Sequence, residues 1–126
     1  MVISRSRAAV ALAVVLVGSA SLHFLTPATF DALVPERLPG SARFWTLASG
    51  VVEAGVGAAV AVPRTRGLGG LAAAALFVAV FPANIKMAID WSDRSTVEQV
   101  IAYVRLPLQI PLVLWGLKVW RNARPT

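Results

Sequence analysis

The chain has 126 residues, of which 57% are hydrophobic and 14% are charged, and it carries a formal net charge of +6. Soluble domains carry about 25% charged residues, so this composition excludes an ordinary soluble globule and indicates one membrane domain surrounded by the lipid bilayer. The lack of cysteine excludes disulfides, thiolate metal sites and iron–sulfur clusters within the chain, and no nucleic-acid recognition fold is predicted that would use the positive charge.

Residues 8–25 form the first apolar run, after a basic start that contains Arg5 and Arg7. At about 1.5 Å per residue, a run of this length just crosses a hydrocarbon core of about 30 Å. A signal peptide has a similar pattern, with small residues such as those at 18–21 before its cleavage site. Because three more apolar runs follow, we interpret the first run as an uncleaved membrane span.

Residues 26–43 form a connector with two turn signals. Thr26 is expected to cap a short helix whose first position is Pro27, and Pro35 is expected to stop that helix. Three apolar side chains would share one of its faces: Phe30, Leu33 and Val34. We therefore expect a short interfacial helix that lies on the membrane and does not cross it.

Residues 44–62 form the second apolar run, with Glu53 near its middle. A carboxyl group inside a membrane span is costly and is commonly functional. Residues at three- and four-residue steps form a stripe on this helix: Thr46, Ser49, Gly50, Glu53 and Gly57. Small residues let neighbouring helices approach closely, so we expect this stripe to face protein.

Residues 67–89 and 100–120 form the third and fourth runs. Pro82 should kink or loosen the third helix because proline lacks a backbone N–H, and the carbonyl that it frees then needs another partner. The polar residues and prolines of these two runs are Pro82, Asn84, Lys86, Arg105, Pro107, Gln109 and Pro111. Together the four runs predict an all-α, antiparallel transmembrane four-helix bundle.

Basic residues without neighbouring acids fall on one side of this four-span arrangement. They are Arg5, Arg7, Arg64, Arg66, Lys118, Arg121 and Arg124. All acids except Glu53 fall on the other side. Because cytoplasmic loops carry an excess of Lys and Arg, this pattern predicts that both termini lie in the cytoplasm.

Helical rise places five polar side chains in the outer half of the bundle. Measured from the inner boundary, their depths are about 15 Å for Glu53, about 14 Å for Gln109, about 20 Å for Arg105, about 24 Å for His23 and about 25 Å for Asn84. These depths predict a polar pocket that opens outward with Glu53 at its floor, and a direct or water-linked contact between Glu53 and Arg105. Lys86 falls at the outer surface and is interpreted as a snorkelling interface residue.

The same residues also fit a structural role. A polar clasp between helices would fix their packing without binding any ligand. In that interpretation Asn84 and Gln109 would replace the helix hydrogen bonds lost at the prolines, and His23 would be a satisfied polar residue at the end of the first span.

Several chemistries are disfavoured by the sequence. One histidine and one deep acid do not build a typical metal site, and no glycine-rich nucleotide motif follows a predicted strand. A Ser–His–acid triad would need Ser49, His23 and Glu53, and nothing in the sequence orients them. We therefore predict no metal ligand and assign no catalytic residue.

Four stretches of the sequence carry a resemblance to a known family. In order they read LHFLTPATFDALVPERLP, SGVVEAGVGAAVAVPRTR, FPANIKMA and YVRLPLQIPLVLWG. This order resembles the DoxX-like group of small four-helix membrane proteins. The resemblance implies a protein of the bacterial inner membrane, linked to quinone-coupled or other membrane oxidoreductase systems. Carried across by position, the characteristic polar residues would be His23, Glu53, Asn84, Arg105 and Gln109.

Three functions are therefore open at this point. The first is a membrane component that binds a small, quinone-like molecule in the polar pocket and assists an oxidoreductase partner subunit. The second is a small-solute transporter, which without a visible inverted repeat would require a homo-oligomer. The third is a packing or assembly subunit with no ligand, for which the polar cluster is only a clasp.

Overall fold

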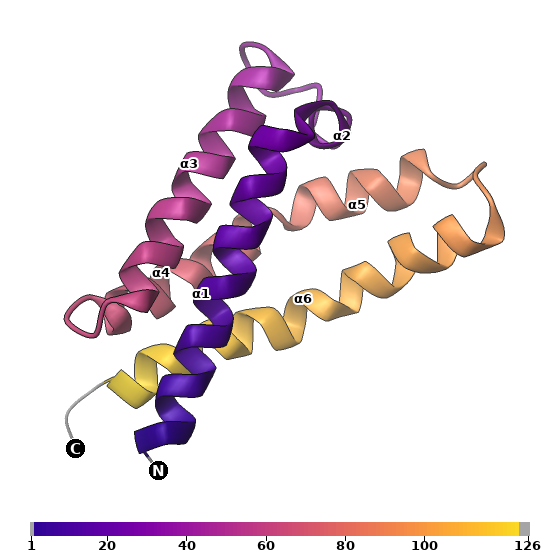
Figure 1. Ribbon diagram of the computed structural model, residues 1–126. Helices are drawn as coiled ribbons and strands as arrows, with labels where there is room; N and C mark the ends of the chain where they lie inside the picture. Colours follow the sequence, from indigo (N-terminus) through magenta and orange to yellow (C-terminus); the bar gives the residue numbers. More distant parts are fainter. Residues whose placement is uncertain (1, 124–126) are drawn as a thin grey trace.

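The computed structural model describes residues 2–123, with side chains from residue 7 onward, and within that range the chain is helical with no strand (Figure 1). The helices are α1 (Val2–Leu25), α2 (Pro27–Asp31), α3 (Ala42–Ala61), α4 (Arg66–Ala79), α5 (Phe81–Asp90) and α6 (Thr96–Ala123). The side chain of Arg5 and the whole of Arg124, both in the expected basic set, lie outside the described residues.

Four helical segments are long and apolar enough to cross a membrane, and α4 and α5 together form one of them. They are Arg7–Leu25, Ala42–Ala61, Arg66–Asp90 and Thr96–Ala123. Their successive directions alternate in Figure 1. The expected all-α, antiparallel four-helix bundle is thereby confirmed, and the chain has the architecture of a multi-pass membrane protein.

The third span is broken where the proline pattern predicts a kink. Helix α4 ends at Ala79, Val80 separates the two helices, and Pro82 lies in the first turn of α5. Proline is tolerated there because the first turn of a helix has no intrahelical acceptor for its N–H. Pro107 and Pro111, by contrast, lie inside the continuous helix α6.

The short helix expected after the first span is present as α2, but two of its predicted details are wrong. Thr26 occupies the N-cap position and Pro27 begins α2, but the Thr26 side chain does not form the expected capping bond, because its hydroxyl donates to Leu22 O one turn earlier in α1, at 2.9 Å. Helix α2 ends at Asp31, before Pro35 is reached. The following connector ends at Ser41, whose hydroxyl caps α3 by accepting from Phe44 N at 3.1 Å.

Close approaches at glycine hold the bundle together in the half that contains the chain termini. A Cβ on Gly70 would lie 2.7 Å from Trp120 N and 2.8 Å from Gly116 O, so α4 and α6 meet backbone to backbone. A Cβ on Gly69 would lie 2.7 Å from Val60 N, which places α4 equally close to α3. The expected protein-facing stripe of α3 is confirmed, since Thr46, Gly50, Glu53 and Gly57 are buried there, whereas Ser49 is only partly buried.

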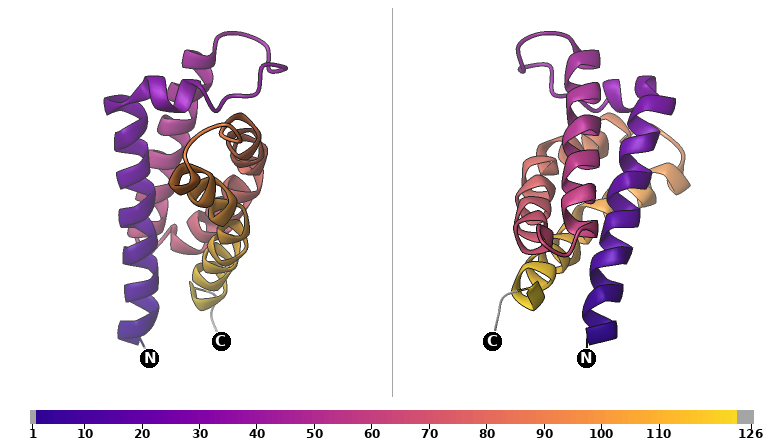
Figure 2. Two further views of the ribbon diagram at one scale, coloured as in Figure 1. Left: turned by 90° about the vertical axis from the view of Figure 1, so that its right-hand side faces the viewer. Right: turned by 60° about the vertical axis from the view of Figure 1, so that its left-hand side comes forward.

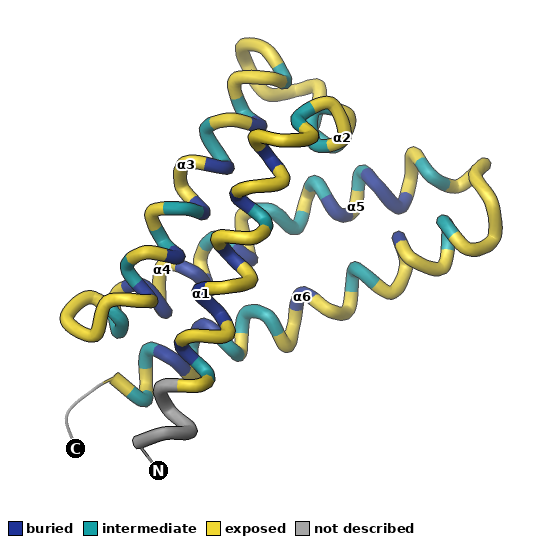
Figure 3. The backbone as a smooth tube through the Cα atoms, viewed as in Figure 1, coloured by how far each residue is buried: buried dark blue, intermediate teal, exposed yellow. Residues whose placement is uncertain are grey.

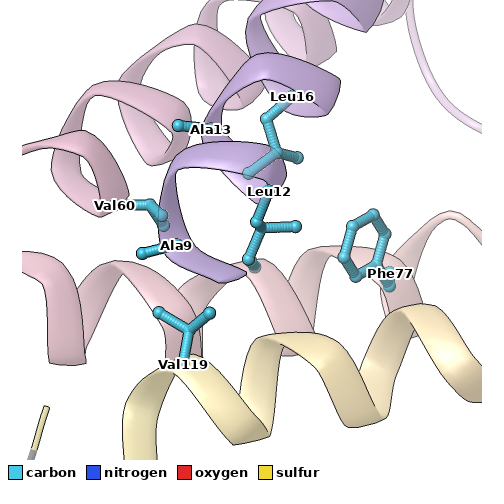
Figure 4. Packing of buried hydrophobic residues seen from close by; sticks show 8 residues of the cluster. Ala9, Leu12, Ala13, Leu16, Val60, Phe77 and Val119 are labelled. Atoms are coloured by element: carbon cyan, nitrogen blue, oxygen red, sulfur yellow. The ribbon is translucent and has the colours of Figure 1, made fainter. Parts of the chain in front are cut away.

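One apolar cluster fills this half of the molecule (Figure 4), and Figure 3 shows buried residues along the helices that meet there. Its buried members are Ala9, Leu12, Ala13, Leu16, Val60, Ala73, Phe77 and Val119. Trp115 Nε1 donates to Ala8 O at 2.9 Å beside it and thus ties α6 to α1.

At the opposite end the two helix pairs separate. Helices α1 and α3 continue side by side towards α2, whereas α5 and α6 lean away from them (Figures 1 and 2). We call this the α2 end, and we call the end with both termini and the α3–α4 turn the terminal end. The turn brings Arg64 and Arg66 to the terminal end together with Lys118 and Arg121 of α6.

The glycine contact between α4 and α6 predicts a strong effect of a single methyl group. The Cβ of a Gly116→Ala variant would lie 2.7 Å from Ala74 N and 2.8 Å from Gly70 O, and neither backbone atom can rotate away. We expect a loss of about 1–3 kcal/mol in unfolding free energy, as in other overpacked cores. Thermal unfolding in mild detergent, followed by tryptophan fluorescence, measures this loss.

Gly55→Ala is the matched control for this substitution. Nothing lies within 4 Å of a Cβ at Gly55, so the variant should be as stable as the wild type or more stable by up to about 1 kcal/mol. Equal stability of the Gly116→Ala and Gly55→Ala variants would contradict the close contact.

Candidate functional site

Glu53 is buried between α3 and α1 and has partners only from α1. Its Oε1 accepts a hydrogen bond from Ser19 Oγ at 3.2 Å. Its Oε2 lies 3.3 Å from His23 Nδ1, and beyond this ionic contact it has no hydrogen-bond partner among the described residues. The deep acid of the second span is therefore held by two side chains one turn apart on the first.

The tautomer of His23 follows from a second contact of the same nitrogen. Nδ1 lies 2.7 Å from Ser19 O, and a carbonyl oxygen can only accept, so Nδ1 must carry a hydrogen. The His23 ring stacks on Phe30 of α2, with the ring centroids 3.8 Å apart and the planes at 19°. His23 Nδ1 thus donates to Ser19 O, and the Glu53 carboxyl group lies beside it in an ionic contact without a hydrogen bond.

This arrangement differs from a hydrolytic triad. In a triad the serine hydroxyl bonds to the histidine, and the acid bonds to the other ring nitrogen. Here the hydroxyl of Ser19 and the ring of His23 both turn to the acid. The geometry holds a carboxyl group in place and does not activate Ser19 as a nucleophile.

A second polar cluster joins α4, α5 and α6, and Gln109 is at its centre. Gln109 Oε1 accepts from Arg105 Nη1 at 2.6 Å and from Asn84 Nδ2 at 3.1 Å. Gln109 Nε2 donates to Phe77 O in the last turn of α4. Carbonyls in the last turn of a helix have no intrahelical donor, so Gln109 satisfies a carbonyl that the break before α5 leaves free.

Arg105 is the least satisfied member of this second cluster. Its side chain is partly buried, and no acid of the described chain lies within ion-pair distance of it. Its one hydrogen bond goes to Gln109. Because a guanidinium has five N–H donors, most of its donors are available to another molecule.

The five residues that the sequence singles out are therefore brought together in two clusters. His23 and Glu53 lie in the α1–α3 pair, and Asn84, Gln109 and Arg105 lie between α5 and α6. The expected direct contact between Glu53 and Arg105 is not formed. The divergence of the helix pairs towards the α2 end keeps them in separate clusters although their depths are similar.

Ser19 is the main site residue that the sequence analysis missed. In the sequence it is one of the small residues at 18–21, and the serine that shares a helix stripe with Glu53 is Ser49. Ser19 and His23 are four residues apart, so they occupy one helix face. That spacing is the signal by which Ser19 could have been found.

One pocket lies at the α2 end and is separate from both clusters. It has a volume of about 210 Å³ and is lined by Asp31, Ala32, Val34, Pro35, Glu36, Leu38, Gly40, Ala42, Trp45 and Lys86. None of the five predicted residues lines it, so this pocket is a different one from the predicted pocket with Glu53 at its floor. Lys86 Nζ donates to Ala32 O at 3.1 Å and pairs with Asp90, which links α5 to the end of α2.

Asp31, the last residue of α2, lines this pocket. Its Oδ2 pairs with Arg43 Nε at 2.9 Å, whereas its Oδ1 is buried without a hydrogen bond. The Thr46 hydroxyl lies near the carboxylate, though outside direct hydrogen-bond geometry, and together with Arg43 it lowers the pKa of Asp31 against the opposing effect of desolvation. Asp31 is thus held as an anion at the α2 end.

The family described as "Domain of unknown function (DUF8561)" matches residues 12–120. The chain belongs to this family. The part shared with the DUF8561 family contains all four spans almost completely and both polar clusters. No curated protein and no solved structure matches the chain.

Removing Gln109 should destabilise this DUF8561 protein measurably. A Gln109→Ala variant leaves Phe77 O, Asn84 and Arg105 without their shared partner, and polar bonds between membrane helices contribute about 0.6–1.7 kcal/mol each. We expect a loss of about 1–3 kcal/mol in unfolding free energy, measured by thermal unfolding in detergent. Gln99→Ala, which removes an amide from the exposed start of α6, should have a smaller effect, and equal effects would contradict the bridging role.

The lowered pKa of Asp31 predicts a stability difference that depends on pH. Its carboxylate stabilises the fold at pH values above its ordinary pKa of 3.8, and this contribution is lost as the pH falls through the lower pKa of the folded state. Asp31→Asn should therefore unfold at a lower temperature than the wild type near neutral pH. The difference should close as the pH is lowered below about 4.

Asp93→Asn is the control for the pH experiment, because Asp93 is an exposed acid of the α5–α6 connector. Its unfolding temperature should follow that of the wild type at each pH. A difference between Asp31→Asn and the wild type that stays constant down to strongly acidic pH would show that the Asp31 charge does not stabilise the fold.

Proposed function

We propose that this DUF8561 protein is a DoxX-like protein of the bacterial inner membrane that binds a small, quinone-like molecule beside Arg105. It would act as an accessory component of a membrane oxidoreductase system, with both termini in the cytoplasm. The order of its sequence motifs supports the family resemblance, and the basic residues at the terminal end support the orientation.

The observation that carries the proposal is the unpaired cation in the fourth span. A charged side chain within a membrane span is costly and usually marks a pathway or a binding site. Arg105 has no acid partner in the described chain, and its one hydrogen bond goes to Gln109. A quinone-like molecule fits such a site because its carbonyl oxygens accept from the free N–H donors and its apolar part lies in the lipid.

The remaining polar residues have different roles in this proposal. Asn84 and Arg105 both donate to the Gln109 carbonyl oxygen, so the two amides position the guanidinium of Arg105. Glu53 and His23 would hold a proton on the α1–α3 side. A bound quinone would supply the electron-accepting chemistry, and the electrons would come from a partner subunit, since the chain has no cysteine for thiol or iron–sulfur redox chemistry.

One observation favours a second candidate function, an assembly subunit without a ligand. The oxygen and the nitrogen of the Gln109 amide both form hydrogen bonds within the chain, and the nitrogen donates to the backbone carbonyl of Phe77. A cluster that exists only for packing would have this property. The two candidates differ in whether Arg105 holds a molecule from outside the chain.

Replacing Arg105 should separate ligand binding from stability. We expect wild-type protein purified in mild detergent to carry a small molecule that native mass spectrometry detects, and Arg105→Ala to lose it. The loss of a charge-assisted hydrogen bond should lower the affinity about tenfold to hundredfold. The unfolding temperature of the ligand-free variant should stay close to that of ligand-free wild type.

Arg94→Ala is the matched control, because it removes one positive charge from the connector at the α2 end. It should retain the molecule. Retention by Arg105→Ala, or a wild type that carries no small molecule, would refute the ligand site. A fall in stability of Arg105→Ala without any bound molecule in the wild type would favour the assembly subunit.

A further inference from the structure

The terminal end carries a positive charge that no acid of the described residues balances. Its described cations lie at the start of α1, at the α3–α4 turn and in the last turns of α6. They are Arg7, Arg64, Arg66, Lys118 and Arg121. The α2 end differs, because it combines four cations with five acids, and three of those cations form ion pairs.

One cation of the terminal end is used inside the fold. Arg66 donates from Nε to Val60 O at 2.9 Å and from Nη2 to Ala61 O at 3.0 Å, and thus satisfies carbonyls at the end of α3 that lack intrahelical donors. The other four cations are exposed and form no hydrogen bond or ion pair with any described residue. They are Arg7, Arg64, Lys118 and Arg121.

Packing contacts hold the three segments that carry these four cations at one end of the molecule (Figure 1). Trp115 Nε1 of α6 donates at 2.9 Å to Ala8 O, directly after Arg7 in α1. A Cβ on Gly67 would lie 3.3 Å from Ala123 Cβ, so the start of α4 meets the end of α6. Basic loops that only set the orientation in the membrane do not need such packing. The four cations therefore form a surface of the folded protein, which unfolding would disperse.

This surface lies where a span meets the lipid headgroups. Two spans begin at Arg7 and Arg66, and the cations of α6 lie in the last turns of the fourth span. Two and four residues from Arg64, the apolar side chains of Val62 and Leu68 are 47% and 74% exposed. Free cations beside exposed apolar side chains fit a molecule that has both a phosphate and hydrocarbon chains, and they favour it over a soluble acidic partner.

We propose that the terminal end binds an anionic phospholipid from the surrounding leaflet. The phosphate of its headgroup accepts hydrogen bonds from the exposed cations, and its acyl chains lie against the apolar side chains beside the α3–α4 turn. Arginine binds phosphate oxygens through two parallel N–H donors, and cations near an anionic membrane surface each strengthen binding. Because the lipid recognises only the folded arrangement, it also stabilises the fold. The site does not depend on a ligand at Arg105.

Competition between two lipids tests this site. Protein in mild detergent is mixed with equal amounts of phosphatidylglycerol and phosphatidylcholine that have the same acyl chains, and native mass spectrometry measures how much of each stays bound. The wild type should retain at least about twentyfold more phosphatidylglycerol, since each cation contributes about fivefold. Arg64→Gln/Arg121→Gln should lower this preference to below about fivefold.

Arg37→Gln/Arg94→Gln is the matched control, because it removes the same charge from the α2 end. It should keep the wild-type preference. Equal retention of the two lipids by the wild type, or the same preference in both double variants, would overturn the proposal. Glycerophosphoglycerol, which is the same headgroup without acyl chains, should not raise the unfolding temperature. A rise equal to that with phosphatidylglycerol would rule out the lipid as the specific ligand.

Tryptophan fluorescence gives a second measurement that leaves every basic residue in place. A Trp45→Phe/Trp91→Phe variant keeps only Trp115 and Trp120, which lie in α6 towards the terminal end. In phosphatidylcholine vesicles, a small fraction of phosphatidylglycerol brominated on its acyl chains should quench this variant more strongly than the same fraction of brominated phosphatidylcholine. High salt should remove the difference, because it screens exposed charges. Equal quenching by the two brominated lipids at low salt would mean that the terminal end does not select the anionic lipid.

Discussion

A bilayer offers no water to a backbone carbonyl that a helix leaves free, so such a carbonyl needs a partner from within the protein. In this chain the break before α5 leaves Phe77 O at the end of α4, and Gln109 of α6 donates to it. The carbonyl oxygen of the same amide accepts hydrogen bonds from Asn84 and Arg105. The position of the Arg105 guanidinium in the fourth span thus depends on the same Gln109 side chain that satisfies Phe77 O at the break.

Small residues determine where the helices can approach one another. Gly50 and Gly57 keep α3 against α1 over most of its length, whereas α4 and α6 meet at Gly70 and Gly116. Helix α5 contains no glycine, and Gly116 is the last glycine of the sequence and the single one in α6. The two helix pairs are therefore close at the terminal end and separate at the α2 end, where the polar residues lie.

The sequence was sufficient for features that depend on local pattern. The apolar runs predicted the four spans, the spacing of small residues predicted the protein-facing stripe of α3, and Pro82 predicted the break in the third span. Thr26 shows the limit of a local rule, because its hydroxyl satisfied the backbone at Leu22 and did not cap the next helix.

The pairing of polar residues could not be predicted in the same way. Helical rise gives the depth of a side chain but neither its direction around the helix nor the distance between helices. Glu53 and Arg105 have similar depths, yet they belong to helix pairs that diverge. Ser19 could not be predicted for a related reason. Its hydroxyl becomes a site group only because the neighbouring helix places the Glu53 carboxyl group within hydrogen-bond distance of it.

The backbone contact between Gly70 and Gly116 also acts as a fulcrum for the α4–α6 pair. Lys86 lies 16 residues beyond Gly70, which makes a lever arm of about 24 Å along the helical path. A tilt of about 5° at the fulcrum would move the end of such an arm by about 2 Å. That displacement is enough to break the hydrogen bond from Lys86 to Ala32, so this bond limits the movement of α5 away from the end of α2.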